Sequence, residues 1–178
     1  MGMATLRRLT AIAVLLSAGS PLRADDDAPP FDWRPLDKVI GSAGVLKDDV
    51  YTFTVPRNDL DVAVDGMEVP AGAGIASDFR FFRCSCGKIR VVGQFCCADY
   101  EVNDVIDAVR AGALIQVASV GPMFLDDKPR VMIVRFQGEG DASALAKLLR
   151  TALDWTGDAR LTTRPSPVVT AATTQPAK

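Results

Sequence analysis

Four cysteines lie close together in this 178-residue chain, at Cys84, Cys86, Cys96 and Cys97, and the chain contains no histidine. Histidine is the commonest metal ligand and the usual general base near neutral pH. Its absence excludes Ser-His-Asp and Cys-His catalysis, and every zinc or iron site that needs an imidazole. Chemistry would have to use thiols, carboxylates, lysine, arginine or tyrosine, and we predict no cofactor.

The stretch 78–97 predicts a β-hairpin with a tight turn at residues 85–88. This turn would place Cys84 opposite Ile89. Cys96 would then lie about 23 Å from Cys84 along the ribbon, because a strand rises about 3.3 Å per residue. A disulfide requires Cα atoms within about 7 Å, so we expect no bond between the first pair of cysteines and the second.

Three fates of the cysteines remain open. Cys84 and Cys86 can form a disulfide across a very short loop, which would stabilise the fold little. Cys96 and Cys97 point to opposite faces of one strand and can stay buried thiols, because cysteine packs as a small hydrophobic residue. The third fate is metal binding or redox work, although the C-x-C and C-C spacings differ from those of structural zinc sites. Cys84 and Cys86 are the more reactive pair, because cations beside the turn favour thiolates.

The N-terminus has the pattern of an export signal. Two arginines precede a short apolar stretch and then small residues, which predicts a signal peptide at residues 1–24 with cleavage after Ala24. Residues 25–30 form a linker, 31–157 one globular domain, and 158–178 a Thr/Pro/Ala-rich tail that we predict to be disordered. We expect a periplasmic or extracellular protein.

Composition limits the partners. The net charge is −2, and without the three arginines of the signal peptide 17 Lys and Arg face 22 Asp and Glu, a net charge of −5. Nucleic-acid binders carry clustered positive charge, so we predict none as a partner. The arginines Arg80, Arg83 and Arg90 are interpreted as a solvated face of the hairpin. The apolar stretch is too short for a transmembrane span, and the first 83 residues contain no cysteine for an N-terminal lipid anchor.

The elements that would position these residues follow from periodicity and from capping residues. Apolar stripes predict helices that begin at Asp99 and Asp141 and end near Gly112 and Gly157. A short helix should end at Gly41. Alternation and apolar runs predict strands at 50–56, 60–64, 78–84, 89–97, 114–120 and 130–136, the fifth of them buried, with a turn at Asp65-Gly66. This order predicts an α+β fold, a mostly antiparallel sheet with helices packed on one face, of which a ferredoxin-like arrangement is one form.

Several phrases of the chain resemble the secreted LppY/LpqO family, a domain of unknown function. The similar segments are Pro56–Val62 with the following Val64–Gly66, Gly93, Glu101-Val102 with Val105, Pro129–Met132, and Gly138–Asp141 with Leu145-Ala146. Their order and spacing extend the resemblance over about residues 33 to 155.

The chain departs from the family at three polar positions. The family carries an HNHLL segment where this chain reads GPMFL, so Gly121 and Met123 replace two histidines. The acidic residue of the family's GDLVL strand is Gln94 here. The resemblance therefore implies that any metal or acid-base role of those residues has been lost at Gln94, Gly121 and Met123.

These observations lead to two hypotheses. The first is a non-catalytic, exported binding or structural domain of the LppY/LpqO type. The alternative is a thiol-based metal-binding or redox protein that uses Cys84 and Cys86. An enzyme that works with carboxylates alone is a weaker third.

Three other groups have structural interpretations. Arg57 and Asp59 would pair with each other at the exit of a strand. Asp126 and Asp127 would belong to an ordinary loop, because two adjacent carboxylates cannot supply the six or more oxygens that Ca²⁺ prefers. The apolar stretch 123–125 either plugs the vacated site or forms an exposed patch, and we favour the plug.

Overall fold

The computed structural model describes residues 31–157, so the predicted signal peptide, linker and tail lie outside the described residues. The helical elements are α1 (Pro35–Ile40), the 3₁₀ turns η1 (Ala71–Ala73) and η2 (Asp99–Glu101), α2 (Val102–Arg110) and α3 (Ala142–Leu153). The strands are β1 (Val45–Lys47), β2 (Val50–Pro56), β3 (Val62–Val64), β4 (Met67–Val69), β5 (Ala76–Arg83), β6 (Ile89–Ala98), β7 (Ile115–Pro122), β8 (Asp127–Lys128) and β9 (Val131–Glu139).

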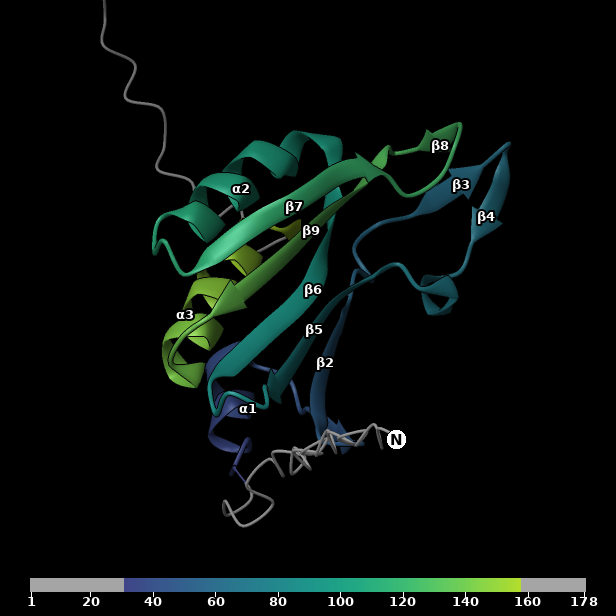
Figure 1. Ribbon diagram of the computed structural model, residues 1–178. Coiled ribbons are helices and arrows are strands. Elements are labelled where there is room, and N and C mark those ends of the chain that lie inside the picture. The colour runs from purple at the N-terminus through teal and green to yellow at the C-terminus, as the bar shows by residue number, and fades with distance from the viewer. Residues whose placement is uncertain (1–30, 158–178) are drawn as a thin grey trace, which may run out of the picture. The chain divides into compact units, whose positions relative to one another are not determined.

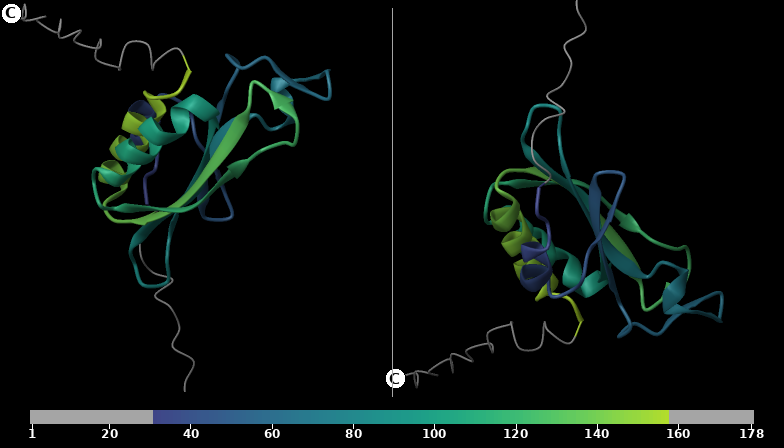
Figure 2. Two further views of the ribbon diagram at one scale, coloured as in Figure 1. Left: turned by 90° about the horizontal axis from the view of Figure 1, so that it is seen from above. Right: turned by 90° about the horizontal axis from the view of Figure 1, so that it is seen from below.

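The fold is α+β, as predicted. Six strands form an antiparallel sheet in the order β1-β2-β5-β6-β9-β7, and a smaller sheet has the order β4-β3-β8. The three α-helices lie together on one face of the large sheet, and the small sheet projects from its far end (Figure 1, Figure 2). Helix α3 packs between α1 and α2. We call the sheet face without helices the outer face.

The second half of the chain contains part of a ferredoxin-like arrangement. β6 and β7 are both antiparallel to β9, which lies between them, so β6 and β7 are parallel and α2 connects them. This is a split βαβ unit, followed by β9 and α3. On its other side β6 pairs with β5, a strand that precedes the split βαβ unit in the chain.

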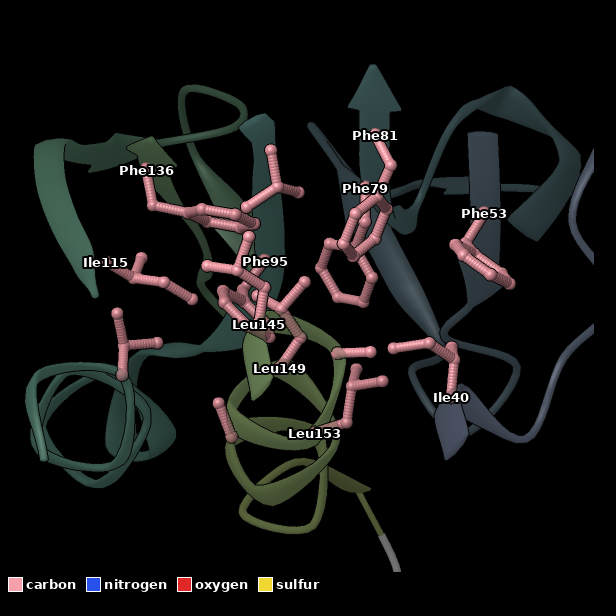
Figure 3. Close-up of a cluster of buried hydrophobic side chains, with 14 of the residues drawn as sticks. Ile40, Phe53, Phe79, Phe81, Phe95, Ile115, Phe136, Leu145, Leu149 and Leu153 are labelled. Carbon is pink, nitrogen blue, oxygen red and sulfur yellow. The ribbon is translucent and has the colours of Figure 1, made fainter. Parts of the chain in front are cut away.

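The main core lies between the large sheet and the helices. Phenylalanines from four strands, Phe53, Phe79, Phe95 and Phe136 among them, face leucines of α3 (Figure 3). Phe79 and Phe95 approach with ring centroids 5.0 Å apart, and Phe95 and Phe136 with centroids 5.1 Å apart. Large aromatic areas in contact supply much of the burial energy of a small domain.

A second core lies on the outer face, at the end of the large sheet near β3 and β8. Cys96 contributes to this second core, whereas its neighbour Cys97 contributes to the main core. Successive strand residues point to opposite faces, so the two thiols are separated by the sheet, as the sequence predicts. The buried members of the second core are Leu60, Val62, Ile75, Cys96, Ala98, Val131 and Ile133.

The predicted hairpin forms, but its register differs by one residue. Ile89 pairs with Arg83 rather than with Cys84, and the turn includes Cys84. The backbone N–H of Cys84 donates to Lys88 O (2.9 Å) and that of Gly87 donates to Cys84 O (2.9 Å). Gly87 has φ +80°, a conformation that glycine adopts without steric cost. The pattern of apolar residues predicted the hairpin but did not reveal this register.

Two details of the region around α2 correct the predictions. Asp99 does not cap the helix: it lies in η2, and its carboxylate accepts from the adjacent Tyr100 N–H. The left-handed residue after the helix is Ala113 (φ +54°), not Gly112. By contrast, Gly41 ends α1 in the left-handed conformation, and the Asp141 carboxylate caps α3 by accepting from Ala144 N–H (2.9 Å), as predicted.

The strand predicted at 114–120 is not buried. β7 is the edge strand of the sheet and has only β9 as a neighbour. Ile115 is buried, but most of the later residues of β7 are exposed. An apolar run predicts burial only when both faces of a strand are covered.

Candidate functional site

The predicted site positions lie on the outer face of the large sheet. In the strand register, Gln94 on β6 lies between Asp78 on β5 and Arg135 on β9, and Arg135 also pairs with Ser119 on β7. Residues in register on antiparallel neighbours point to the same face, so these four side chains form one polar row across the sheet. The Asp78 carboxylate in addition accepts from the Thr54 hydroxyl on β2 (2.8 Å).

Gly121 occupies the next row of the same face. It pairs with Ile133, which also pairs with Cys96 of the second core. A Cβ atom built on Gly121 would meet no atom within 4 Å, and its φ is an ordinary one. The backbone therefore leaves room here for a side chain that this chain does not have.

Met123 and Phe124 follow directly. Both are half-buried and pack against the second core, and the Met123 N–H donates to Val131 O (2.8 Å). Leu125 is instead 77% exposed. The stretch is thus divided: Met123 and Phe124 pack against the second core without coming within 4 Å of a Cβ at Gly121, and Leu125 forms part of the surface.

Asp127 is buried on the same loop, although the sequence suggested only an ordinary loop residue. One carboxylate oxygen accepts from Val131 N–H (2.6 Å), and the other, Oδ1, has no hydrogen-bond partner among residues 31–157. Asp126 beside it is exposed, with φ +56°. The two aspartates therefore do not act as a pair.

A second polar cluster lies at Arg57. The predicted pair with Asp59 is present, with two hydrogen bonds of 2.7 and 2.8 Å. The same guanidinium also binds Glu101 (2.8 and 3.1 Å) and donates to Cys96 O (2.7 Å). The Glu101 carboxylate in turn accepts from Ala98 N–H and Gly157 N–H, each at 2.8 Å.

Electrostatics favour the charged forms of Arg57 and Asp59. Burial lowers the pKa of Arg57, but hydrogen bonds to Asp59 and Glu101 outweigh it, so the pKa lies above its ordinary value. The hydrogen bonds from Arg57 lower the pKa of Asp59. The hydrogen bonds of the cluster join the exit of β2, the start of α2 and the end of α3.

Sequence reasoning missed Glu101 as a partner of Arg57. The two residues are 44 positions apart, and no local spacing connects them. One local signal was available: Glu101 stands three residues after Ala98, the spacing at which a glutamate reaches back to the backbone N–H at a helix start.

Two hollows border these clusters. One, of about 380 Å³, is lined by Arg90, Val92, Gln116, Gln137 and Glu139 among others, and the other, of about 430 Å³, lies beside Arg57. Neither is lined by Gln94, Gly121 or Met123. In the first, the Glu139 carboxylate binds both Lys88 (2.6 Å) and Arg90 (2.9 Å). Of the three arginines predicted to form a solvated face, Arg90 therefore takes part in an ion pair.

The cysteines divide into two kinds. Cys84 and Cys86 form a disulfide, with Cα atoms 5.1 Å apart, whereas Cys96 and Cys97 are free and buried. Burial raises the pKa of Cys96 to about 11 and raises that of Cys97 further. Both buried groups therefore remain protonated thiols near neutral pH, and thiols are far weaker nucleophiles than thiolates.

Among residues 31–157, no group of three or more Cys, Asp or Glu side chains is arranged to hold a metal ion. No helix of the same residues has the length and apolar character needed to cross a membrane.

Comparison with known proteins identifies the domain. The model of the family described as Domain of Unknown Function (DUF1259) matches residues 34–155, which covers both the polar row and the Arg57 cluster. No curated protein and no solved structure matches the chain. The family match spans more than half of the chain and nearly all of its described residues, so this protein belongs to the family of the domain of unknown function DUF1259.

Proposed function

We propose that this protein is an exported, non-catalytic domain of the LppY/LpqO type that binds a ligand or partner on the outer face of its large sheet. The observation that carries the proposal is the common location of Gln94 and Gly121. They come from different strands, yet they lie in adjacent rows of one face, with Met123 directly after β7.

The chemistry of these three positions supports a binding role rather than a catalytic one. They hold an amide, a glycine and a thioether, and none of these groups exchanges a proton near neutral pH. Met123 and Phe124 pack against the second core, and the space at the Gly121 Cβ position stays open. The polar row next to it still offers an amide, a guanidinium and a hydroxyl to a ligand, through Gln94, Arg135 and Ser119.

A turnover assay tests this proposal. Purified full-length protein is incubated with chromogenic esters, phosphoesters and glycosides, each with and without added ZnCl₂ or MnCl₂, beside the variant Gln94→Ala. We expect wild type and variant to give the same background rate. Turnover by wild type that the variant lacks would show a catalytic site on the outer face and overturn the proposal.

The alternative is a thiol-based protein, and one observation favours its redox form over its metal-binding form. The Cys84–Cys86 bond occupies both sulfur atoms, so neither is free to bind a metal in this state. Thiol counting checks the assignment. Without reductant, denatured protein should show two thiols, those of Cys96 and Cys97, and four after reduction.

A further inference from the structure

We propose that the Cys84–Cys86 disulfide is a thiol–disulfide exchange site that oxidises pairs of thiols. The inference is independent of the binding role proposed above, because it uses no residue of the polar row. It concerns the tip of the β5–β6 hairpin, where Cys86 is exposed and Cys84 is half-buried. An exposed disulfide at a loop tip is open to attack by a thiolate from solution.

The bond contributes little to holding the hairpin together. It links residues only two positions apart, and a disulfide that closes so short a loop restricts the unfolded chain very little. Hydrogen bonds already close the turn, from Cys84 N–H to Lys88 O and from Gly87 N–H to Cys84 O. Gly87 supplies the left-handed conformation that the turn needs.

Contacts beyond the turn also hold this segment independently of the sulfur atoms. The Lys88 ammonium binds the Glu139 carboxylate on β9 (2.6 Å), and Gly140 N–H donates to Ile89 O (3.2 Å). β5 and β6 are paired up to Arg83 and Ile89, directly before the turn. The turn therefore has contacts that hold it when the disulfide is opened.

The other two cysteines do not compete in this chemistry. Cys96 and Cys97 have no exposed surface, and burial raises the pKa of both thiols. The fold thus separates one accessible pair of sulfur atoms from two inaccessible ones. The exposed basic side chain of Arg83, next to the accessible pair, favours the approach of an anionic thiolate.

The proposed reaction proceeds in two balanced steps. A substrate thiolate attacks the exposed sulfur of Cys86, a mixed disulfide forms, and Cys84 leaves as the thiolate. A second substrate thiolate then attacks the substrate sulfur of the mixed disulfide and releases Cys86. The substrate thiols lose two electrons and form a disulfide, the protein disulfide gains them, and the two substrate protons end on Cys84 and Cys86.

The test uses oxidised full-length protein and two thiol sources, a reduced dithiol peptide and reduced glutathione. Acid quenching, alkylation and mass spectrometry report the thiols of each species. We expect one peptide disulfide per protein chain, with new thiols at Cys84 and Cys86 only. If glutathione alone reduces the pair, the substrate class is low-molecular-weight thiols; if both do, it includes protein thiols.

Two variants sharpen the result. Cys84→Ser removes the leaving thiolate, so peptide oxidation should be lost, while Cys86 should capture one glutathione from oxidised glutathione. Ser85→Ala changes the same turn without touching a sulfur atom and should keep wild-type exchange. The proposal is overturned if the folded wild-type disulfide resists both thiols and becomes reducible only after denaturation. Because this arm uses wild type, it does not depend on the folding of any variant.

Discussion

Arg57 and Glu101 form the most deeply buried ion pair of the described residues, with side chains 4% and 1% exposed. A buried pair gains little net stability over apolar residues, but removal of one partner leaves the other charge uncompensated. The two oxygens of Glu101 also accept from backbone N–H groups, Oε2 from Ala98 and Oε1 from Gly157. At the scale of single residues, this carboxylate ties a buried guanidinium to two separate backbone segments.

We expect Glu101→Gln to lower the free energy of unfolding by about 3 kcal/mol, because the charge of buried Arg57 loses its most deeply buried partner. Asp59→Asn is the matched control. Asp59 binds the same guanidinium but is 27% exposed, so water screens its loss and the expected cost is about 1 kcal/mol or less. Urea unfolding at pH 7 measures both. Equal losses in the two variants would show that the burial of Glu101 does not set its contribution.

At the scale of elements, two glycines of the large sheet differ in how much space surrounds them. Gly93 lies on β6 between Phe79 and Phe136, and a Cβ there would lie 2.2 Å from the Asp78 carbonyl oxygen. Gly121 lies on the edge strand β7, where a Cβ would meet nothing within 4 Å. Only the first glycine is required by the packing of its element.

We therefore expect Gly93→Ala to lower the free energy of unfolding by at least about 1 to 3 kcal/mol, the usual cost of overpacking, because backbone atoms must move. Gly121→Ala should change it by less than about 0.5 kcal/mol, as for most surface substitutions. Urea titrations of the two variants give the comparison. A large loss in Gly121→Ala would mean that the space beside Gly121 is filled in solution, contrary to the vacated-site interpretation.

At the scale of the whole molecule, two cores hold one large sheet from opposite sides. The helices cover one face, while β3, β8 and the stretch after β7 cover one end of the other. The polar row at Gln94 and Arg135 is left uncovered between the second core and the hairpin tip. An open polar sheet face on an exported domain is the arrangement on which the proposed binding role depends.

The proposed export is testable on the whole chain. We expect expression in a bacterial host to yield a mature protein that begins at Asp25, because the n-region, apolar stretch and small residues before it form a cleavable signal. Intact-mass measurement of the periplasmic fraction determines the first residue. The control Leu15→Arg interrupts the apolar stretch and should leave an uncleaved precursor. Recovery of wild type as an uncleaved, intracellular chain would contradict export.

The sequence alone determined what depends on neighbouring residues. Periodicity and capping residues predicted the α+β class, most strands, the end of α1 at Gly41 and the start of α3 at Asp141. Alternation predicted that Cys96 and Cys97 would lie on opposite faces. The lack of histidine excluded imidazole chemistry outright. These are local properties, set by backbone geometry and residue type.

Only the tertiary structure decided what depends on distant residues coming together. It set the one-residue change in the hairpin register, joined Arg57 to Glu101, and placed Gln94 and Gly121 on one face. It also showed that Cys84 and Cys86 form a disulfide and that Cys96 and Cys97 are buried thiols. The physical reason is that strand register and long-range pairing are chosen by the total burial and hydrogen bonding of the whole sheet, which no window of the sequence contains.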